Sequence, residues 1–456
     1  MRLKAIVLAA GEGTRMKSRL PKVLHKVCGQ TMLKHVIDTA NNSDVEECIV
    51  VVGYEAEKIK GSLSSETKTV LQEKQLGTGH AVMMAYDNIN EEDTVLVLYG
   101  DAPLITEKTL RTMVNYHDKG NFKATVLTAD LPNPEGYGRI IRDTENQLQK
   151  IVEEKDASER EKSITEINSG IYCFDGGALK DALPKLRNNN SQNEYYLTDV
   201  LPIIRDMGLK VGLYKVQDYE EIMAVNSREQ LAEVEAIMRK RIAKKHMENG
   251  VTIINPTHTY IEKAVTIGMD TVIYAGAMLT GSTVIGEDCI IGQNSRIENS
   301  TIGNGVEVQS STIISSNVGE GTTVGPYAHL RPNSNVGKYV KIGGFVEVKN
   351  SRIDDYSKAS HLSYVGDADV GRNVNIGCGV VFVNYDGKNK SRSTIEDNTF
   401  IGSNVNLVAP VVIRENGYIA CGSTITSEVP GGALAIARAR QENKEGWVNK
   451  KGLLKE

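Results

Sequence analysis

The sequence LAAGEGTRM, residues 8–16, directly continues the short apolar run Ala5–Leu8. A continuous apolar run of this length predicts a strand buried inside a parallel sheet. The small residues and two glycines after it let backbone N–H groups approach a phosphate, because glycine lacks the Cβ that would block the approach. Arg15 and Lys22 add positive charge beside this loop. The stretch therefore carries the groups that hold a nucleoside triphosphate and stabilise charge developing on it.

Two common phosphate-binding motifs do not fit this loop. A Walker loop requires Lys-Ser or Lys-Thr after its second glycine, whereas Thr14-Arg15 follows Gly13. The dinucleotide fingerprint requires a third glycine three residues after the second, and that position is Met16. A lone Gly-x-Gly would equally suit a structural turn. The longer pattern, which ends in Pro21-Lys22, resembles the signature of the sugar-phosphate nucleotidyltransferases, the enzymes that make nucleotide sugars.

Length, charge and cysteine usage limit the class of protein. A chain of 456 residues is too long for one core and predicts two or three domains. The net charge of −5 gives no reason to expect a nucleic-acid partner. The first apolar run is far shorter than the roughly 20 residues of a membrane span, and no signal-peptide pattern precedes it. The six cysteines are scattered without a C-x-x-C, which is typical of reduced thiols and not of disulfides or a zinc site. We expect a cytoplasmic protein.

Residues 1–226 alternate strand-like apolar runs with helical stretches. The strand-like runs after the first are residues 48–53, 94–99 and 124–128, and the helical stretches include 33–40 and 79–86. This alternation predicts an α/β, Rossmann-like domain with a mainly parallel sheet. Ligands of such sheets bind beyond the carboxyl ends of the strands. Both the glycine loop and Tyr99-Gly100-Asp101 follow strands in this way.

A helix is predicted over residues 227–250, where it would link two domains. Ser227 can cap its start with Gln230 completing a capping box, and Asn249-Gly250 can end it. Apolar residues follow the cap at helical spacing. The basic cluster at residues 239–245 fits a solvated face near the helix C-terminus, with an anion site as the alternative.

Residues 251–456 carry a six-residue aliphatic period. It includes Ile261, Ile267, Ile273, Leu279, Ile285, Ile291 and Ile297, resumes at Ile302, Val318 and Ile395, and often has glycine after the aliphatic residue. This period predicts a parallel β-helix with one inward aliphatic residue per face, and the aromatic content of 5% suits its narrow bore. The polar excursion at residues 384–394 should stand off one edge. The repeats resemble the left-handed β-helix of the hexapeptide-repeat acyltransferases, and the handedness follows from that resemblance alone.

Three groups in the first half suit nucleotidyl transfer. Asp101 offers a hard oxygen ligand for Mg²⁺, with a helix N-cap as the alternative role. Gln72 with Gly77-Thr78 suits the edge of a pyrimidine, although the glycine pair also fits the start of a helix. The segment Glu135–Ile140 lets the backbone approach a sugar, or forms a plain β-turn.

Nearly the whole chain resembles the bacterial bifunctional enzymes that join N-acetylglucosamine-1-phosphate uridyltransferase to glucosamine-1-phosphate N-acetyltransferase. The resemblance implies that UTP and N-acetylglucosamine 1-phosphate react in the first domain, with Mg²⁺ held by Asp101 and Asn226. It implies that Arg15 and Lys22 are catalytic, stabilising the transition state and the leaving pyrophosphate. The implied uridine nucleotide and sugar contacts are Leu8, Ala9, Ala10, Gly11, Lys22, Gln72, Gly77, Thr78, Tyr99, Gly100, Asp101, Gly138, Glu153, Asn168 and Asn226.

The second half carries groups suited to acetyl transfer onto an amine. His361 is the candidate base because imidazole titrates near neutrality, and Glu347 is a candidate to orient it. Arg331 and Lys349 suit a sugar phosphate. The resemblance adds Tyr364 and Asn375 to the glucosamine 1-phosphate site. It assigns acetyl-CoA to Asn384, Tyr385, Ser403, Arg438 and to Cys378 and Cys421, where many relatives carry alanine. It also implies a homotrimer with acetyl sites between subunits, which the tail at residues 437–447 could reach.

Two other functions compete with the bifunctional enzyme. One is a single-activity nucleotide-sugar pyrophosphorylase whose β-helix serves only oligomerisation or regulation. His361 with Arg331 and Lys349 argues against it. The other is a regulatory subunit with the same folds and no catalysis, which would not need Arg15, Lys22 and Asp101.

Overall fold

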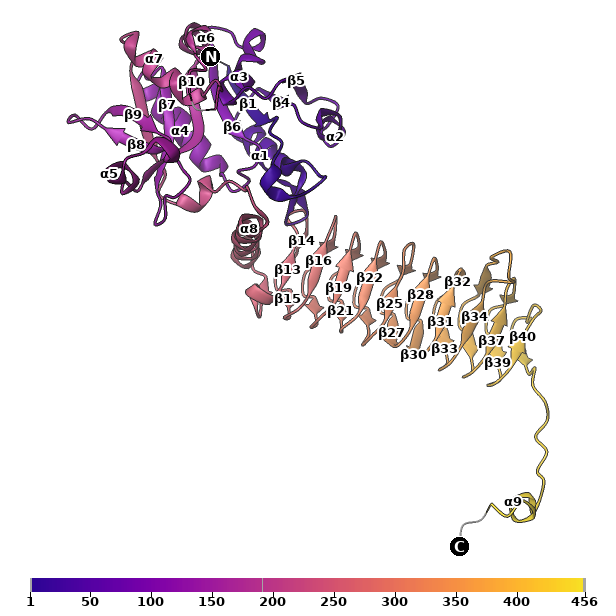
Figure 1. The fold of residues 1–456 in the computed structure, drawn as a ribbon. Helices are drawn as coiled ribbons and strands as arrows, with labels where there is room; N and C mark the ends of the chain where they lie inside the picture. Colours follow the sequence, from indigo (N-terminus) through magenta and orange to yellow (C-terminus); the bar gives the residue numbers. More distant parts are fainter. Residues whose placement is uncertain (1, 191, 454–456) are drawn as a thin grey trace. The chain divides into compact units, whose positions relative to one another are not determined.

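The computed structural model describes residues 2–190 and 192–453, and they form two compact units, one up to Met238 and the other from Arg239 (Figure 1). The first unit carries the helices and the mixed sheet, and the second carries the coils of a β-helix. No helix among the described residues combines the length and apolar character that a membrane crossing requires.

A sheet of nine strands runs through the described part of the first unit. Its main order is β11 (Val211–Lys215), β7 (Ala124–Asp130), β10 (Glu166–Asp175), β6 (Thr94–Tyr99), β1 (Leu3–Ala9), β4 (Glu47–Val52) and β5 (Lys68–Leu71). The pairs from β6 to β5 and the pair of β11 with β7 are parallel, so the predicted mainly parallel sheet is confirmed. Strand β10 runs antiparallel to both of its neighbours, and a hairpin of β8 (Arg139–Arg142) and β9 (Leu148–Val152) extends from it.

Helices cover both faces of this sheet because alternate residues of each buried strand point in opposite directions. Ile6 and Leu8 of β1 belong to one apolar core, and Ala5 and Val7 belong to the other. The first core also contains residues of α3 (Thr78–Met83), α6 (Gly176–Ala182) and α7 (Val200–Asp206). The second contains residues of α1 (Met32–Asn41), α2 (Ala56–Lys60) and α4 (Glu107–Lys119). Short α5 (Glu159–Lys162) follows the β8–β9 hairpin.

Helix α8 (Arg228–Glu248) confirms the predicted linker helix, with two local differences. The Ser227 side chain caps it by accepting from the Gln230 N–H at 3.2 Å, but the Gln230 side chain accepts from the Asn226 N–H at 2.7 Å instead of closing a capping box. In the basic cluster, Lys240, Lys244 and Lys245 are exposed as expected. Arg239 is not, because it donates to the carbonyls of Thr257 and Thr259 and lies over the Tyr260 ring.

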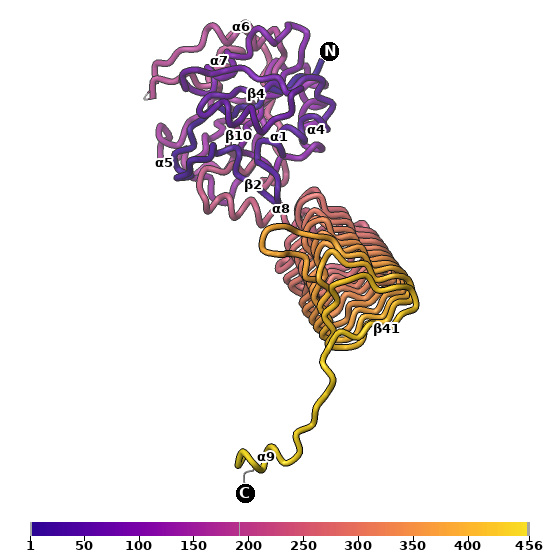
Figure 2. Tube along the Cα trace, turned by 90° about the vertical axis from the view of Figure 1, so that its right-hand side faces the viewer, coloured from indigo at the N-terminus to yellow at the C-terminus, as the bar shows by residue number. Residues whose placement is uncertain are grey.

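Three parallel sheets form the β-helix of the second unit. They run from β12 (Thr252–Ile253) to β41 (Leu434–Ala435), from β13 (Tyr260–Ile261) to β40 (Thr424–Ile425), and from β14 (Thr266–Ile267) to β38 (Val412–Ile413). Each strand generally pairs with the third one along the chain, so residues of the predicted period stack, as Ile273 does on Ile291. The predicted left-handed β-helix of hexapeptide repeats is confirmed. Figure 2 shows the stacked coils, and the loop 384–392 leaves them between β34 (Val381–Val383) and β35 (Ser393–Ile395).

Two adjacent isoleucines test the inward and outward alternation of the β-helix. Ile291 is fully buried, whereas Ile290 is 43% exposed on the outer surface of the same strand, β18 (Ile290–Ile291). We expect Ile291→Ala to lower the free energy of unfolding of the β-helix by about 2–5 kcal/mol because it leaves a cavity. Ile290→Ala should cost about 1 kcal/mol or less. Chemical unfolding followed by circular dichroism measures both, and equal losses would contradict this packing.

Candidate functional site

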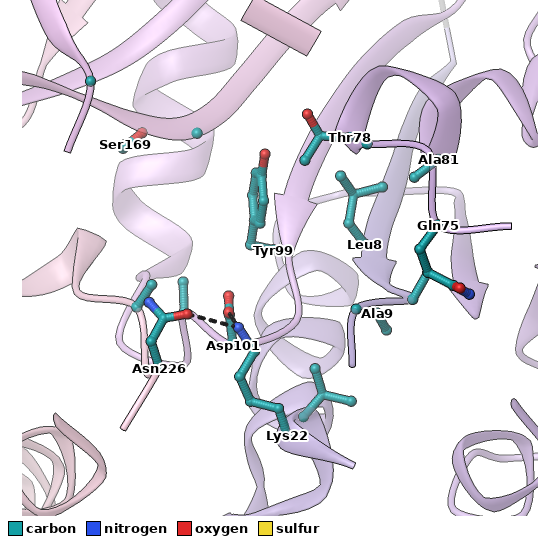
Figure 3. A pocket seen from close by; sticks show the side chains of 18 of the residues that line it. Leu8, Ala9, Lys22, Gln75, Thr78, Ala81, Tyr99, Asp101, Ser169 and Asn226 are labelled. Carbon is teal, nitrogen blue, oxygen red and sulfur yellow. Dashed lines mark hydrogen bonds and ion pairs between the residues drawn. The ribbon is translucent and has the colours of Figure 1, made fainter. Parts of the chain in front are cut away.

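A cavity of about 460 Å³ lies at the carboxyl edge of the first sheet (Figure 3). The parallel register sets Leu8 beside Tyr99, and the Gly100 N–H donates to the Leu8 carbonyl at 3.0 Å. The glycine loop after β1 and the acidic turn after β6 therefore open into the same space, as the switch between neighbouring parallel strands requires.

Most of the residues expected at the nucleotide site line this cavity. They are Leu8, Ala9, Ala10, Gly11, Lys22, Gln72, Gly77, Thr78, Tyr99, Asp101, Gly138, Glu153, Asn168 and Asn226. Gly100 and Arg15 are not among the lining residues. Gly100 lies behind the wall, where a Cβ would meet Leu33 and Val23. Arg15 lies in a short 3-10 turn, Thr14–Met16, with its side chain exposed to solvent.

Lys22, Asp101 and Asn226 meet at one end of the cavity (Figure 3). The Lys22 ammonium forms an ion pair with Asp101 Oδ2 and donates to Asn226 Oδ1 at 3.0 Å. Asp101 Oδ1 is buried and finds no hydrogen-bond partner in the described part of the chain. Asp101 is not a helix cap, because Thr106 caps α4. A carboxylate oxygen left bare beside an amide oxygen suits a hard divalent cation.

The opposite end of the cavity is built from the turn between β5 and α3. Gly77 and Thr78 begin α3 and also line the cavity, so the helix-start role and the binding role of this turn coexist. Gly77 has φ of +102°, and a Cβ there would lie 2.6 Å from the Tyr195 carbonyl oxygen. The backbone of Tyr195 thus presses against this turn, which only glycine permits.

The β8–β9 hairpin supplies a third wall. The turn before β8 closes by a bond from the Tyr137 N–H to the Pro134 carbonyl, and Tyr137 and Gly138 line the cavity. The adjacent carboxylates diverge: Glu153 lines the cavity, while Glu154 pairs with Arg139 at 2.8 Å and accepts from the Gly136 N–H. The segment 134–137 therefore forms a turn, and of the two carboxylates only Glu153 faces the cavity.

A bulge in β10 completes the cavity. The register between β10 and β7 shifts between Asn168 and Tyr172, and the Asn168 N–H donates to the Gly138 carbonyl at 2.8 Å. Gly170 in this bulge has φ of +81°, and a Cβ would lie 2.8 Å from the Tyr99 ring. Such bulges redirect side chains beside binding sites.

Ten further residues line the cavity, and of these only Gly136 and Tyr137 belong to a segment singled out from the sequence, Glu135–Ile140. The ten are Val23, Gln75, Ala81, Ala102, Gly136, Tyr137, Ser169, Gly170, Glu194 and Ala224. Gly170, which directly precedes the apolar run Ile171–Phe174, is the one local mark of the bulge.

The second unit brings two of the expected residues together around a cavity of about 400 Å³. Arg331 and Lys349 line it, and each has an acidic partner: Glu347 at 2.8 Å from Arg331 and Asp367 at 3.4 Å from Lys349. Asp367, which the sequence did not single out, also accepts from Asn384. Lys390 of the loop 384–392 adds another cation to the lining.

His361 ends β30 (Lys358–His361) and is exposed. Glu347 and Tyr364 pair with each other in the sheet that runs from β13 to β40, whereas β30 belongs to the sheet that runs from β12 to β41. The Glu347 carboxylate accepts from Arg331, and no hydrogen bond joins Glu347 to His361 in the described residues. Tyr364 accepts from Asn384 Nδ2 at 3.3 Å, so a chain of contacts links Tyr364 to Asp367 and Lys349.

The expected acetyl-CoA residues occupy successive coils. The Cys378 carbonyl accepts from Asn404 beside Ser403, and the Ser403 carbonyl accepts from Gly422 beside Cys421. The Arg438 side chain approaches Gly422 at the last coil. Asn375, expected at the sugar, lies outside this series of coil residues, in β33 (Asn375–Ile376). Tyr385 is exposed in the loop 384–392.

Comparison with known proteins agrees with both halves. Residues 4–220 match the nucleotidyl transferase family model, and residues 264–299 and 315–350 match the six-repeat bacterial transferase hexapeptide model. The chain is 72% identical over 455 residues to the bifunctional protein GlmU of Alkaliphilus oremlandii, covering 100% of both chains. It is 65% identical to that of Alkaliphilus metalliredigens, covering 99% of each. It is 62% identical to that of Clostridioides difficile, covering 99% of this chain and 98% of that one.

The chain belongs to the bifunctional GlmU family. Membership gives one chain two transferase units, a nucleotidyltransferase followed by a hexapeptide acetyltransferase. In this GlmU-family chain the two cavities described above lie one in each unit.

The adjacent carboxylates Glu153 and Glu154 have opposite pKa shifts. Burial raises the pKa of Glu153, and the nearby Asp156 and Asp199 raise it further. Burial also opposes ionisation of Glu154, but bonds from the Gly136 N–H and from Arg139 prevail and lower its pKa. An exposed carboxyl of an unfolded chain titrates near pH 4.3.

Glu153→Gln should therefore stabilise the first unit at neutral pH. The folded wild type holds the Glu153 proton more tightly than the unfolded chain, so its stability falls as the pH rises above about 4.3 through the raised pKa. We expect the gain from Glu153→Gln to vanish near pH 4. Glu154→Gln is the matched control and should lower the melting temperature at neutral pH, with the deficit shrinking as the pH falls below about 4.3. Calorimetry at both pH values measures these differences, and shifts of the same sign would contradict them.

Proposed function

We propose that the first unit transfers the uridylyl group of UTP to N-acetylglucosamine 1-phosphate and releases pyrophosphate. The observation that carries this proposal is the meeting of Lys22, Asp101 and Asn226 beside the glycine loop. We assign this activity to residues 1–226, the linker helix to 227–250, and the acetyltransferase with its tail to 251–456.

The reaction requires in-line attack on the α-phosphorus of UTP. Backbone N–H groups of residues 8–11 would hold the phosphates, and the uracil would lie against Gln72, Gly77 and Thr78. The sugar would lie against Gly138, Glu153 and Asn168. A phosphate oxygen of the sugar phosphate bonds to the α-phosphorus while the bond to the departing pyrophosphate breaks. Lys22 and Arg15 would neutralise the departing charge.

Asp101 and Asn226 would hold Mg²⁺. The bare buried oxygen of Asp101 and the amide oxygen of Asn226 are the hard donors this ion prefers. Mg²⁺, when bound, neutralises phosphate charge and polarises the α-phosphoryl group. The Val225 N–H donates to the Asp101 carbonyl at 2.9 Å, which keeps Asn226 beside Asp101.

We propose that the β-helix unit acetylates glucosamine 1-phosphate with acetyl-CoA. Arg331 and Lys349, which line one cavity with Lys390, would bind the phosphate, and Tyr364 and Asn375 the sugar. His361 would take the ammonium proton, after which the amine bonds to the thioester carbon and coenzyme A leaves as the thiol. Glu347 would orient His361 once substrate phosphate occupies Arg331 and frees the carboxylate. Asn384, Tyr385, Cys378, Ser403, Cys421 and Arg438 would bind acetyl-CoA.

We infer that three chains assemble through their β-helices in the cytoplasm. Tyr327, Phe345 and Leu362 form an apolar ridge on successive coils next to His361, with exposed fractions of 62%, 62% and 59%. An exposed apolar ridge favours burial against another subunit. The exposed tail carrying Arg438 would then complete a neighbouring acetyl site. Sedimentation equilibrium should give three times the chain mass.

Single substitutions should separate the two activities. With glucosamine 1-phosphate, acetyl-CoA, UTP and Mg²⁺ supplied, His361→Ala should abolish thiol release. It should leave pyrophosphate release from UTP and supplied N-acetylglucosamine 1-phosphate unchanged. Asp101→Ala should do the reverse, because each residue lies in a different unit.

The wild type also separates the competing functions. Pyrophosphate release without thiol release would indicate a single-activity pyrophosphorylase, and neither product would indicate a regulatory protein. Loss of both activities in either folded variant would contradict the proposal of two separate sites.

Removal of the metal should affect only the first activity. Excess EDTA is expected to stop pyrophosphate release and leave thiol release intact, since the donors assigned to Mg²⁺ belong to the first unit alone. Asp101→Asn should raise the Mg²⁺ concentration needed for half-maximal rate about tenfold or more, because a neutral amide replaces the charged ligand. Unchanged Mg²⁺ dependence in that variant would remove Asp101 from the metal site.

A further inference from the structure

Two hydrogen bonds hold the Gln72 side chain in one direction. Gln72 follows β5 and lines the first cavity. Only 3% of its surface is exposed. Its Nε2 lies 3.1 Å from the Gly77 carbonyl oxygen and 3.0 Å from Nδ1 of His80. A carbonyl oxygen only accepts hydrogen bonds, so the atom facing Gly77 must be the amide nitrogen.

His80 takes the second N–H of the same amide. Its Nδ1 therefore acts as an acceptor, and the proton of the neutral ring resides on Nε2. Burial lowers the pKa of His80, which favours this neutral ring. The ring also stacks against Tyr195 with centroids 6.3 Å apart.

The backbone holds both partners of Gln72 in place. The Gly79 N–H donates to the Tyr195 carbonyl, and the Tyr195 N–H donates to the Leu76 carbonyl, each at 2.8 Å. The Gln72 N–H itself donates to the Val52 carbonyl at 2.7 Å. Neither Gly77 nor His80 can therefore move away without breaking contacts to a separate segment.

The amide oxygen of Gln72 is left to the ligand. Both amide N–H groups are used, and Oε1 accepts no hydrogen bond from the described residues. In the cavity this oxygen can only accept. Uracil presents an N–H at N3, whereas N3 of cytosine is itself an acceptor, so the fixed oxygen pairs with the first and opposes the second.

We propose that His80 is a positioning residue that sets the preference for a uracil nucleotide, by holding the Gln72 amide with its oxygen toward the base. This inference rests on the proposed uridylyl transfer. Without the imidazole acceptor, the amide can rotate by a half-turn and present its nitrogen to N3 of cytosine. Only the Gly77 carbonyl would then oppose the rotation.

The matched variants are His80→Leu and His80→Asn. Leucine fills similar space without an acceptor, whereas the amide oxygen of asparagine can occupy the place of Nδ1. The readout is kcat/KM for UTP and for CTP in pyrophosphate release with N-acetylglucosamine 1-phosphate. We expect the UTP to CTP ratio to fall about tenfold or more in His80→Leu and to stay within about threefold of wild type in His80→Asn.

A merely structural role of His80 would lower both rates together and leave the ratio unchanged. An unchanged ratio in His80→Leu, or an equal fall in both variants, overturns the inference. If His80→Leu does not fold by thermal melting, His80→Ala replaces it with the same expected fall.

The wild type supplies an independent measurement. N3-methyl-UTP lacks the N3 proton. Its inhibition constant against UTP should therefore exceed the KM for UTP about tenfold or more. Equal competition overturns the assigned direction of the Gln72 oxygen. A wild type that does not turn over UTP defeats the proposed function instead, which keeps the two failures apart.

Discussion

Parallel pairing of β1 with β6 brings Leu8 level with Tyr99, and this register decides where the chemistry of the first unit lies. The loops that follow the two strands must then emerge side by side at one edge of the sheet. The register itself is fixed from both faces, because Ile6 and Val7 are buried in different cores. A slip by one residue would turn each side chain into the wrong core and separate the glycine loop from Asp101.

Segments distant in sequence reach this edge because the start of α8 is tied to it. Asn226 precedes the helix and receives the Lys22 ammonium, while Arg228 donates to the Met16 carbonyl at 3.3 Å. Further along, Glu235 accepts from the Cys28 N–H at 2.8 Å. The start of α8 thus holds the segment that carries Arg15 and Lys22 at two further points, Met16 and Cys28. The predicted connector is also a structural part of the first site.

The sequence predicted features that depend on neighbours along the chain. The glycine loop, the turn at Gly77 and the inward isoleucines all follow from local spacing, and the structure has them. Glu194 and Asp367 carry no local signal, because each is brought to its cavity only by the folding of other segments. Likewise an apolar run does not reveal strand direction, so the sequence did not predict that β10 runs antiparallel to its neighbours. Arg15 had the right charge, but its exposed position depends on the conformation of the whole loop.

The loop 384–392 leaves the β-helix after Val383 and returns at Ser393, and both residues pair with strands of other coils. The pairing with those coils fixes Val383 and Ser393 in place, independently of the residues between them. Because closing a loop costs only about 0.6 kcal/mol more for each doubling of its length, this corner tolerates insertion and replacement. The β-helix is thus a scaffold on which natural variation or protein engineering can exchange a ligand-contacting segment without redesigning the core.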